Sequence, residues 1–525
     1  MKIGLGKAVR GRTGAIFFLF ALLPAALSCS GGAEKRPNVL WVVWDTARAD
    51  RFGLYGGGPT TPFLEEWAET ARVYEDCLSE SNYTLPSHAS FFTGLPPSLH
   101  GCTNSRPFLS ENLVTVAELF RDAGYDTYLW SANPHISKVK KFDQGFETVE
   151  HPWQIEFQKR ALEIVSGKIR PEDVSSELPP KVRAARVGPW DIKASGALAA
   201  EALFRWIDDR EEGGAPWFAF LNYMEAHRPY IPPEKYRRRM MSEEEVLRSY
   251  EVDRSWTPLW SYTFGLKEYD EEELSVTAGT YDACIAELDD LFRGLIEALR
   301  ERRKLDDTVV ILTSDHGEHL GEHHMLDHQY SLYQQLIHVP LLIRYPSRIP
   351  PGRDRRPVMT GDLFPTLLAL AGIDRPPAPE GSGAVSLLAP PAERTRIAES
   401  LGPFRQPFDE VRRAHPAWDS APWEREIRAV VETPWKLIAW DDGEKKLFRL
   451  DGDPGEERDR LDEEPERAKR LAALLEGRGV AAAFGDSSET PELPEEHREM
   501  LRALGYIGGG AAPETSAARE KDGKP

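Results

Sequence analysis

Four continuous apolar runs constrain the fold of this chain more than any other feature. They are "NVLWVVW" (38–44), "WFAFLNY" (217–223), "TVVILT" (308–313) and "VPLLIRY" (339–345). Short uninterrupted runs of this kind are typical of strands that are buried on both faces. Stretches with helical periodicity, such as 194–210 and 280–302, lie between them. The alternation predicts an α/β fold: a large, mostly parallel sheet flanked by helices, with its functional site at the carboxyl ends of the strands.

The chain has 525 residues, which is too long for one simple core. Polar, charged segments interrupt the strand and helix pattern, and a Pro- and Gly-rich stretch precedes a region that predicts a small antiparallel sheet. We therefore predict the following parts: a signal peptide (1–28), a spacer (29–37), a catalytic domain (38–375) with insertions at 151–195 and 236–273, a small C-terminal α+β subdomain (376–484), and a short helix with a disordered tail (485–525).

The N-terminus is typical of an export signal. Four basic residues and no acid occupy the first twelve positions, an apolar run over 15–28 follows, and Cys29 comes next. The run is short and interrupted by proline, which argues against a membrane span. The residues before Cys29 resemble a bacterial lipoprotein cleavage site, although Ala26 stands where leucine is usual. We predict an exported protein of the bacterial periplasm or cell surface, anchored to the membrane by a lipid on Cys29. An unlipidated signal peptide and a retained anchor are the alternatives.

Charge and cysteine content exclude several classes of function. The formal net charge of −20 argues against a nucleic-acid partner. After Cys29 the cysteines are Cys77, Cys102 and Cys284, which show neither a CxxC pair nor a metal-binding spacing. We expect buried free thiols at these three positions.

Charged and imidazole side chains follow three of the apolar runs. Asp45 follows 38–44, His227 follows 217–223, and Asp315 with His316 follows 308–313. Taken singly, these residues could cap a turn, lie in the core or belong to a solvated loop. Because a sheet of this class gathers the ends of its strands at one edge, we expect them to meet there. Oxygen and nitrogen donors together suit Mg²⁺, Ca²⁺, Mn²⁺ or Zn²⁺ without selecting among them.

Thr84 lies in "SNYTLPSHASFFTG" (81–94), at the start of a predicted helix that ends near Gly94. One interpretation is a helix N-cap, since threonine is a good cap and proline is tolerated in the first turn. The other is a nucleophile, because a nearby divalent ion lowers the pKa of a hydroxyl group. The residues alone leave both interpretations open.

These segments, in this order, resemble the sulfatase family of the alkaline phosphatase superfamily. The resemblance runs from Asn38 to about Leu461 and includes "NVLWVVWDTARADRFGLYG", "TLPSHASFFTGLPPSLHG", "FLNYMEAHRPYIPP" and "ILTSDHGEHLGEHH". It implies that one divalent metal ion is held by four residues: Asp45, Thr84, Asp315 and His316.

The resemblance also implies roles around that ion. Thr84 would be the nucleophile, and His227 would contact the ester or the leaving-group oxygen. Asn104 lies where related hydrolases place an asparagine on the substrate anion, and we group His88 with it as substrate-binding. His328 lies near the position of a lysine in several relatives and would donate a proton to the leaving group. A plain loop histidine is the alternative at position 328.

The sequence departs from the family pattern at three positions, and these departures change the nucleophile that we expect. Classical sulfatases oxidise a cysteine or serine to formylglycine in a C/S-x-P-x-R motif, whereas this chain has Thr84 and, in place of the arginine, His88. Thr46 also stands where a second aspartate is common. The departures argue against formylglycine and favour the family's threonine-dependent phosphotransferases and phosphodiesterases.

The sequence therefore predicts a metal-dependent hydrolase or phosphotransferase that acts on an anionic ester of a glycan, a lipid or a small molecule. We favour a phosphate ester. The alternatives are a true sulfuric ester hydrolase with an unmodified threonine, and a catalytically weak pseudoenzyme that binds an anion or a glycan. The complete set of metal-ligand candidates argues against the pseudoenzyme.

Overall fold

The computed structural model describes residues 36–168, 193, 195–211, 213–254, 256–378 and 381–476, with the isolated positions 494, 495, 498 and 501. By internal contacts the chain divides into Met1–Lys35 and Arg36–Pro525, and the described residues belong to the second unit. The expected signal peptide, the lipidation site at Cys29 and nearly all of the expected C-terminal tail lie outside the described residues.

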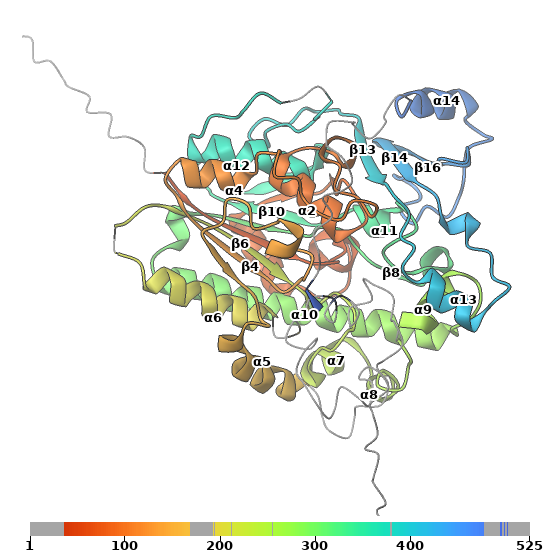
Figure 1. Cartoon of the computed structure of the whole chain (residues 1–525), viewed down its shortest axis with the longest axis horizontal. Coiled ribbons are helices and arrows are strands. Elements are labelled where there is room, and N and C mark those ends of the chain that lie inside the picture. The colour runs from red at the N-terminus through yellow and green to blue at the C-terminus, as the bar shows by residue number, and fades with distance from the viewer. Residues whose placement is uncertain are drawn as a thin grey trace, which may run out of the picture. The chain divides into compact units, whose positions relative to one another are not determined.

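An eight-stranded sheet forms the centre of the described unit (Figure 1). Its strand order is β11-β2-β10-β7-β1-β6-β4-β5. Strand β1 pairs in parallel with both β6 and β7, and β4 pairs in parallel with β5 and β6. The strands of this sheet are β1 (Asn38–Trp44), β2 (Arg72–Tyr74), β4 (Asp126–Ser131), β5 (Thr148–Glu150), β6 (Trp217–Tyr223), β7 (Thr308–Thr313), β10 (Leu341–Arg344) and β11 (Gly352–Asp354).

The prediction of a large, mostly parallel sheet is confirmed, and the first three apolar runs coincide with β1, β6 and β7. The fourth run contains β10, which pairs antiparallel with β7 and with β2. Between β7 and β10 the chain has only short elements: the helix α11 (Gln334–Ile337), the 3-10 helix η8 (Glu322–His324) and the two-residue strands β8 (His319–Leu320) and β9 (Leu326–Asp327). A parallel partner would require a longer crossover along the sheet, so the chain returns antiparallel instead.

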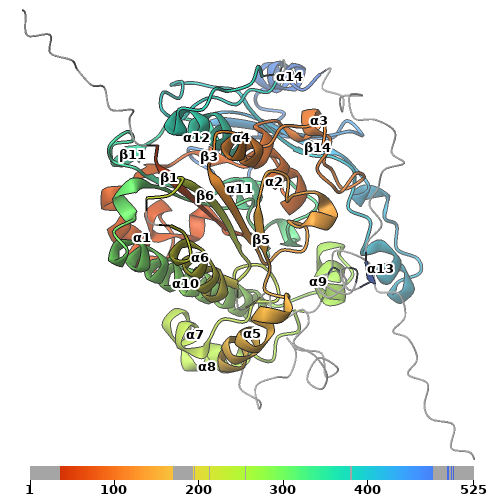
Figure 2. The ribbon, with the colours of Figure 1, turned by 60° about the vertical axis from the view of Figure 1, so that its left-hand side comes forward.

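Helices cover both faces of the sheet (Figures 1 and 2). Successive residues of β1 point to opposite faces, with Trp41 in one buried cluster and Val42 in the other. The cluster around Trp41 includes residues of α2 (Thr84–Thr93), α4 (Val116–Asp122) and α12 (Leu363–Ala371). The cluster around Val42 includes residues of α1 (Pro62–Trp67), α5 (Ile155–Lys168), α6 (Ser195–Asp208) and α10 (Glu271–Glu301). Burial on both faces explains why these strands are continuously apolar.

A second sheet follows the large one in the sequence. It has the order β13-β14-β15-β16, all antiparallel, and is the small C-terminal domain expected from the sequence. The chain outside the large sheet contains β3 (Cys77–Leu78), β12 (Val358–Met359), β13 (Arg396–Ser400), β14 (Ile427–Glu432), β15 (Trp435–Trp440), β16 (Lys445–Arg449), α3 (Pro97–His100), α7 (Glu234–Met240), α8 (Glu243–Arg248), α9 (Trp256–Thr263), α13 (Phe408–Ala414) and α14 (Pro465–Ala473).

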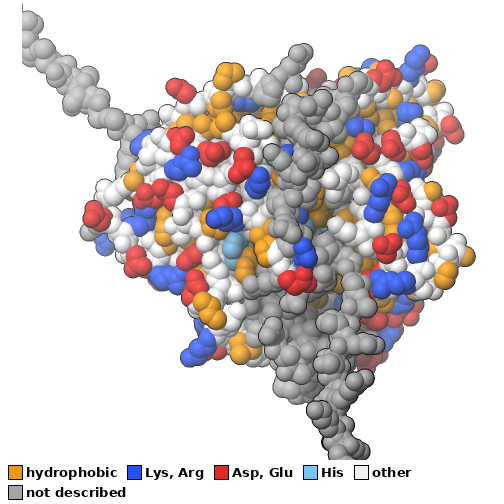
Figure 3. Space-filling view, viewed as in Figure 1, with side chains coloured by type: hydrophobic (Ala, Val, Ile, Leu, Met, Phe, Trp, Pro, Cys, Tyr) orange, Lys and Arg blue, Asp and Glu red, His pale blue; other side chains and the backbone are white. Residues whose placement is uncertain are grey.

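Three further observations concern the described residues. Cys77, Cys102 and Cys284 are buried free thiols, as expected. Within the described residues, no helix combines the length and apolar character needed to cross a membrane. On the face seen in Figure 3, acidic and basic side chains are interspersed.

Candidate active site

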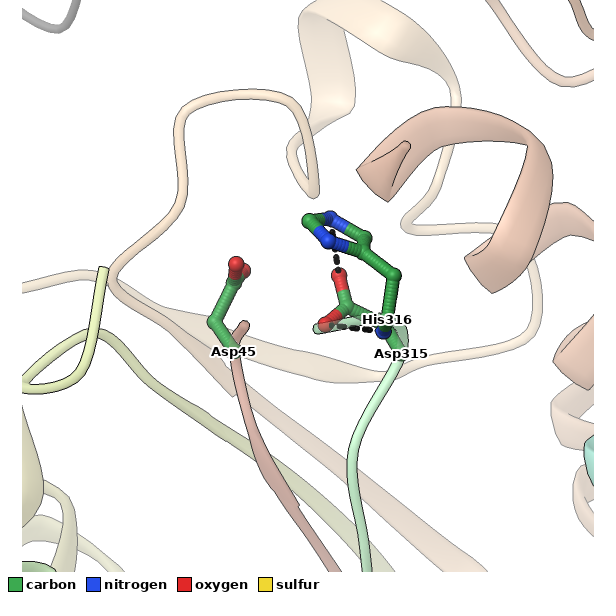
Figure 4. A group of neighbouring side chains, drawn as sticks. All are labelled: Asp45, Asp315 and His316. Atoms are coloured by element: carbon green, nitrogen blue, oxygen red, sulfur yellow. Dashed lines mark hydrogen bonds and ion pairs between the residues drawn. The ribbon is translucent and has the colours of Figure 1, made fainter. Parts of the chain in front are cut away.

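Side chains from several chain segments meet at the carboxyl edge of the large sheet. Asp45 follows β1, and Asp315 and His316 follow β7, the strand that pairs with β1. One oxygen or nitrogen atom from each of the three lies within 4.8 Å of the others, and all three residues are fully buried. Figure 4 shows Asp45 across a short gap from Asp315 and His316. The meeting of strand ends predicted from the sequence is therefore present in the structure.

Only one oxygen of Asp45 is hydrogen bonded. Its Oδ2 accepts bonds from the side-chain amides of Asn133, at 2.9 Å, and Asn222, at 3.1 Å. Oδ1 is buried and accepts no hydrogen bond from any described residue. Burial, and next the charge of Asp315, raises the pKa of Asp45 to about 7. The Asp45 carboxylate thus keeps one oxygen free for a further partner.

Asp315 repeats this arrangement with backbone donors. Its Oδ1 accepts bonds from the N–H groups of Thr46, at 3.1 Å, and His316, at 2.9 Å, while Oδ2 accepts no hydrogen bond from the described chain. Burial raises the pKa of Asp315 to about 7.

Thr46 replaces the second aspartate of the family pattern. Its backbone is left-handed (φ 63°) and its hydroxyl donates to the Asp45 carbonyl at 2.7 Å. It therefore contributes a backbone donor where relatives have a carboxylate.

His316 directs its Nε2 toward the same carboxylates, with Asp315 Oδ2 at 3.4 Å. Its Nδ1 lies 2.9 Å from the carbonyl oxygen of Gly317, which can only accept, so Nδ1 carries the proton and Nε2 has a free lone pair. Burial lowers the pKa of His316 to about 3, which keeps the ring neutral. Two unpartnered carboxylate oxygens and one imidazole nitrogen form a donor set that fits a divalent cation.

The hydroxyl of Thr84 lies beside this donor set. Tyr83 is the N-cap of α2, and no side-chain bond caps this helix end. Thr84 is the first helical residue, and its Oγ1 lies 3.4 Å from His316 Nε2 and 3.4 Å from the amide nitrogen of Asn133. The N-cap interpretation of Thr84 is therefore wrong. The expected end of the helix is present, since Gly94 is left-handed (φ 67°) and donates to the Ser90 carbonyl.

His88, which replaces the motif's arginine, lies one helical turn after Thr84. Its Nδ1 donates to the Thr84 carbonyl at 2.9 Å and lies 3.5 Å from Asp315 Oδ2. Burial lowers the pKa of His88 to about 3, and its ring packs against Phe91 and Phe220. A neutral ring in this position cannot supply the charge of an arginine.

His328 is the one cationic histidine of the site. Burial disfavours its charge, but Asp327 and Glu318 outweigh this effect and raise the pKa of His328 to about 10. Nδ1 lies 2.9 Å from Asp327 Oδ1 and 3.2 Å from Glu318 Oε1, whereas Nε2 is buried and makes no hydrogen bond to a described residue. The His328 ring centroid lies 4.5 Å from that of His316 and 5.3 Å from that of His227. The structure therefore brings His328 to the site.

The three residues Glu318, Asp327 and His328 also have the spacing of a metal site. However, Arg228 binds Asp327 at 2.6 Å, and the His328 imidazolium lies between both carboxylates. Two negative and two positive charges balance here. This group is therefore a buried ion-pair network, whereas no arginine or lysine of the described residues forms an ion pair with Asp45 or Asp315.

His227 is buried in the loop after β6. Its Nδ1 donates to the Arg228 carbonyl at 2.7 Å. The ammonium group of Lys193 donates to the carbonyl oxygens of His227 and Met224. These two hydrogen bonds fix the backbone of the loop that carries His227. Lys193 was missed in the sequence because it lies on no strand end and in no motif.

The structure gives different positions to two asparagines, Asn104, which was predicted from the sequence, and Asn133, which was not. Asn104 is partly exposed, its N–H donates to the Leu401 carbonyl, and no hydrogen bond joins its side chain to the cluster within the described chain. Its substrate-binding role stays a prediction. Asn133, which the sequence analysis missed, bonds to Asp45 and lies within 3.4 Å of the Thr84 hydroxyl. Its position two residues after β4 was the available signal, because β4 pairs with β6 at the same edge.

Comparisons with known proteins show which family this chain resembles. The family model described as Sulfatase matches residues 37–373, and the model described as N-sulphoglucosamine sulphohydrolase, C-terminal, matches residues 321–477. Arylsulfatase K of Xenopus laevis is 26% identical over 89% of this chain and 88% of its own. Choline-sulfatase of Rhizobium meliloti is 25% identical over 86% and 87%. The solved phosphonate monoester hydrolase of Agrobacterium radiobacter shares the fold, with a TM-score of 0.63 and 21% identity over 84% of this chain and 95% of that one.

Proposed function

This chain belongs to the sulfatase family, and we propose that it hydrolyses a phosphate ester with Thr84 as the nucleophile and without formylglycine. The observation that carries the proposal is the position of the Thr84 hydroxyl, 3.4 Å from His316 Nε2 beside two buried carboxylates. The unmodified threonine and the neutral His88 both argue against the formylglycine route.

Asp45, Asp315, His316 and Thr84 would hold one divalent cation, and calcium, magnesium, manganese and zinc remain the candidates. When bound, such a cation supplies positive charge that lowers the pKa of a hydroxyl and neutralises the anionic ester. Asn133 contributes in a different way. Its amide orients the Asp45 carboxylate and is close enough to donate a hydrogen bond to Thr84 Oγ1.

The reaction has two displacements at phosphorus. The deprotonated Thr84 oxygen forms a bond to phosphorus as the bond to the leaving oxygen breaks, and His328 Nε2–H protonates that oxygen. Water then attacks the phosphothreonine, His328 takes a proton from the water, and the bond between phosphorus and Oγ1 breaks. His227 would contact the ester, and Asn104 would bind its anion. An alcohol in place of water would make the enzyme a phosphotransferase.

The threonine also explains why a phosphate ester is favoured. A formylglycine hydrate releases sulfate by collapsing to the aldehyde, but a threonine ester has no such route. It must be cleaved by a second attack, which the threonine-dependent relatives perform on phosphoryl groups. A sulfuric ester hydrolase with unmodified Thr84 is the second candidate, favoured by the Sulfatase model match.

We further propose that the enzyme is exported and anchored by a lipid on Cys29. The support is the basic and apolar leader before Cys29.

The test compares kcat/KM for matched nitrophenyl phosphate, phosphodiester and sulfate substrates. We expect a phosphate ester to be the best substrate of the wild type. Thr84→Ser should retain part of the activity because a hydroxyl remains, and Thr84→Ala should lose nearly all of it. His328→Gln should impair substrates with poor leaving groups more than nitrophenyl substrates. Preference for the sulfate, or full activity of Thr84→Ala, would overturn the proposal.

A further inference from the structure

A buried lysine makes two hydrogen bonds to the loop after β6. Lys193 is only 1% exposed, and its ammonium group donates to the carbonyl oxygens of Met224 and His227. Burial lowers the pKa of Lys193 to about 8, so the group still carries its charge at neutral pH. An apolar side chain such as methionine would fill this space without the cost of removing a charge from water. What the ammonium group adds here is the pair of bonds to the loop.

Two neighbouring residues bond to the same loop. The hydroxyl of Ser195 accepts from the N–H of Met224 at 3.3 Å, and the N–H of Gly196 donates to the carboxylate of Glu225 at 2.8 Å. These two residues begin α6, which packs on the sheet. Together with Lys193 they connect the loop to a helix of the core.

A buried ion-pair network fixes Lys193 in turn. The ammonium group of Lys168 donates to the Lys193 carbonyl and pairs with Glu287 at 2.6 Å. It also lies 4.0 Å from the carboxylate of Glu225, on the loop itself. Lys168 ends α5 and Glu287 lies on α10, so two further helices support the lysine. A satisfied network of this kind makes its surroundings rigid.

The orientation of the His227 ring depends on the backbone that Lys193 bonds. His227 Nδ1 donates to the carbonyl oxygen of the next residue, Arg228, at 2.7 Å. Because the ring and its acceptor belong to adjacent residues, a rotation of the backbone between them would turn the ring. The His227 ring centroid lies 5.3 Å from that of His328, the proposed proton donor. A shift of the loop would therefore move the ring within the site, and a misplacement of about 1 Å can cost about 100-fold in rate.

We propose that Lys193 is a positioning residue, which sets the place of the His227 imidazole through the backbone of the loop. The inference rests on the proposed function, in which His227 contacts the ester. It adds a residue that acts on the reaction through another side chain. It also gives the stretch before α6 a part in the reaction, although that stretch contains none of the family motifs.

The kinetic test is a double-mutant cycle of Lys193→Met and His227→Ala, measured on the best of the three nitrophenyl substrates. Lys193→Met alone should lower kcat and kcat/KM together by about 10- to 100-fold, because the misplaced ring stabilises the transition state less. In the His227→Ala background it should change kcat by less than about two-fold, since the ring that it positions is absent. A lysine with a purely structural role would cause the same loss in both backgrounds, and that result would overturn the inference.

Lys436→Met is the matched control. Lys436 is another fully buried lysine, on β15, and it pairs with Glu456 at 2.8 Å. This variant should lower Tm but leave kcat and KM within about two-fold. A loss of kcat as large as that of Lys193→Met would show that any buried lysine has this effect and would refute the assignment.

Lys193→Gln is the milder variant, because it keeps hydrogen-bond donors without the charge. It should retain more activity than Lys193→Met, and it takes the place of that variant in the cycle if Lys193→Met does not fold. Lower activity in Lys193→Gln than in a folded Lys193→Met would contradict a role for the two carbonyl bonds.

Hydrogen exchange separates the inference from the proposed chemistry, because it needs no turnover. The amides of residues 222–228 should exchange at least about three-fold faster in Lys193→Met than in the wild type, and those of Lys436→Met should not. If no ester is cleaved but this difference is seen, the proposed function fails and the positioning of the loop stands. If esters are cleaved and Lys193→Met changes neither kcat nor exchange, the inference fails and the function stands.

Discussion

The hydroxyl oxygen of Thr84 lies 3.4 Å from Nε2 of His316, although 232 residues separate the two in the sequence. The start of α2 brings Thr84 to the edge of the sheet where the chain leaves β7. A hydroxyl, an imidazole nitrogen and two carboxylates with one unbonded oxygen each thus share one buried site.

Asp45→Asn and Asp315→Asn should each lose the bound divalent metal and at least about 1,000-fold in kcat, which corresponds to several kcal/mol of lost charge stabilisation. The fold should survive, because both residues follow a strand end and burial disfavours their charge. Metal content by mass spectrometry and unfolding by circular dichroism check this.

The matched control for those variants is Asp289→Asn. Asp289 is also buried, but its carboxylate accepts the N–H groups of Phe63 and Leu64 at the start of α1. This variant should lose stability, by about 1 kcal/mol, and keep its metal. Metal loss in the control, or full metal content in Asp45→Asn, would contradict the assigned site.

The stability of the metal-free protein should depend on pH because of the carboxyl groups of Asp45 and Asp315. Burial raises the pKa of both Asp45 and Asp315 from 3.8 to about 7. Between about pH 4 and pH 7 both carboxyl groups are protonated in the metal-free fold but ionised in the unfolded chain. The free energy of unfolding of the metal-free protein therefore falls as the pH rises through this range. A divalent ion displaces those protons, so it binds more tightly at high pH. The gain in Tm on adding metal after EDTA should grow from pH 5 to pH 8, and an equal gain at both would refute this.

The fold and the core of the site could be predicted because they depend on local patterns. The run 38–44 is a strand in the sequence and in the structure, and the residues that follow β1 and β7 meet because their strands are neighbours. The neighbouring residues that orient these side chains, or that set their charge, could not be predicted. Asn133 and Lys193 reach the site through tertiary packing, and the charge of His328 depends on two carboxylates brought to its ring by folding.

Asn133→Ala should lower kcat about 10- to 100-fold with a smaller change in KM, because Asn133 orients Asp45 and lies beside the nucleophile. Asn222→Ala is the informative comparison, since Asn222 bonds to the same Asp45 oxygen and, within the described residues, makes no hydrogen bond to Thr84. It should weaken metal binding to a similar degree and reduce kcat less at saturating metal. Equal kcat values for the two variants would show that the contact of Asn133 with Thr84 has no kinetic role.

Cys29→Ser should move the protein from the membrane fraction to the soluble exported fraction of a bacterial host. One acyl chain binds a membrane only marginally, so a stable anchor requires the several chains of a lipidated cysteine. Fractionation with and without the substitution measures this. An unchanged distribution would favour an ordinary signal peptide or a retained hydrophobic anchor.

The most direct measurement is the intact mass of the protein after brief exposure to a reactive phosphate ester, followed by peptide mapping. We predict an unmodified Thr84 before exposure and a phosphoryl adduct on Thr84 after it, absent from Thr84→Ala. An adduct on another residue, or a sulfate ester that modifies Thr84 while phosphate esters do not, would contradict the central claim.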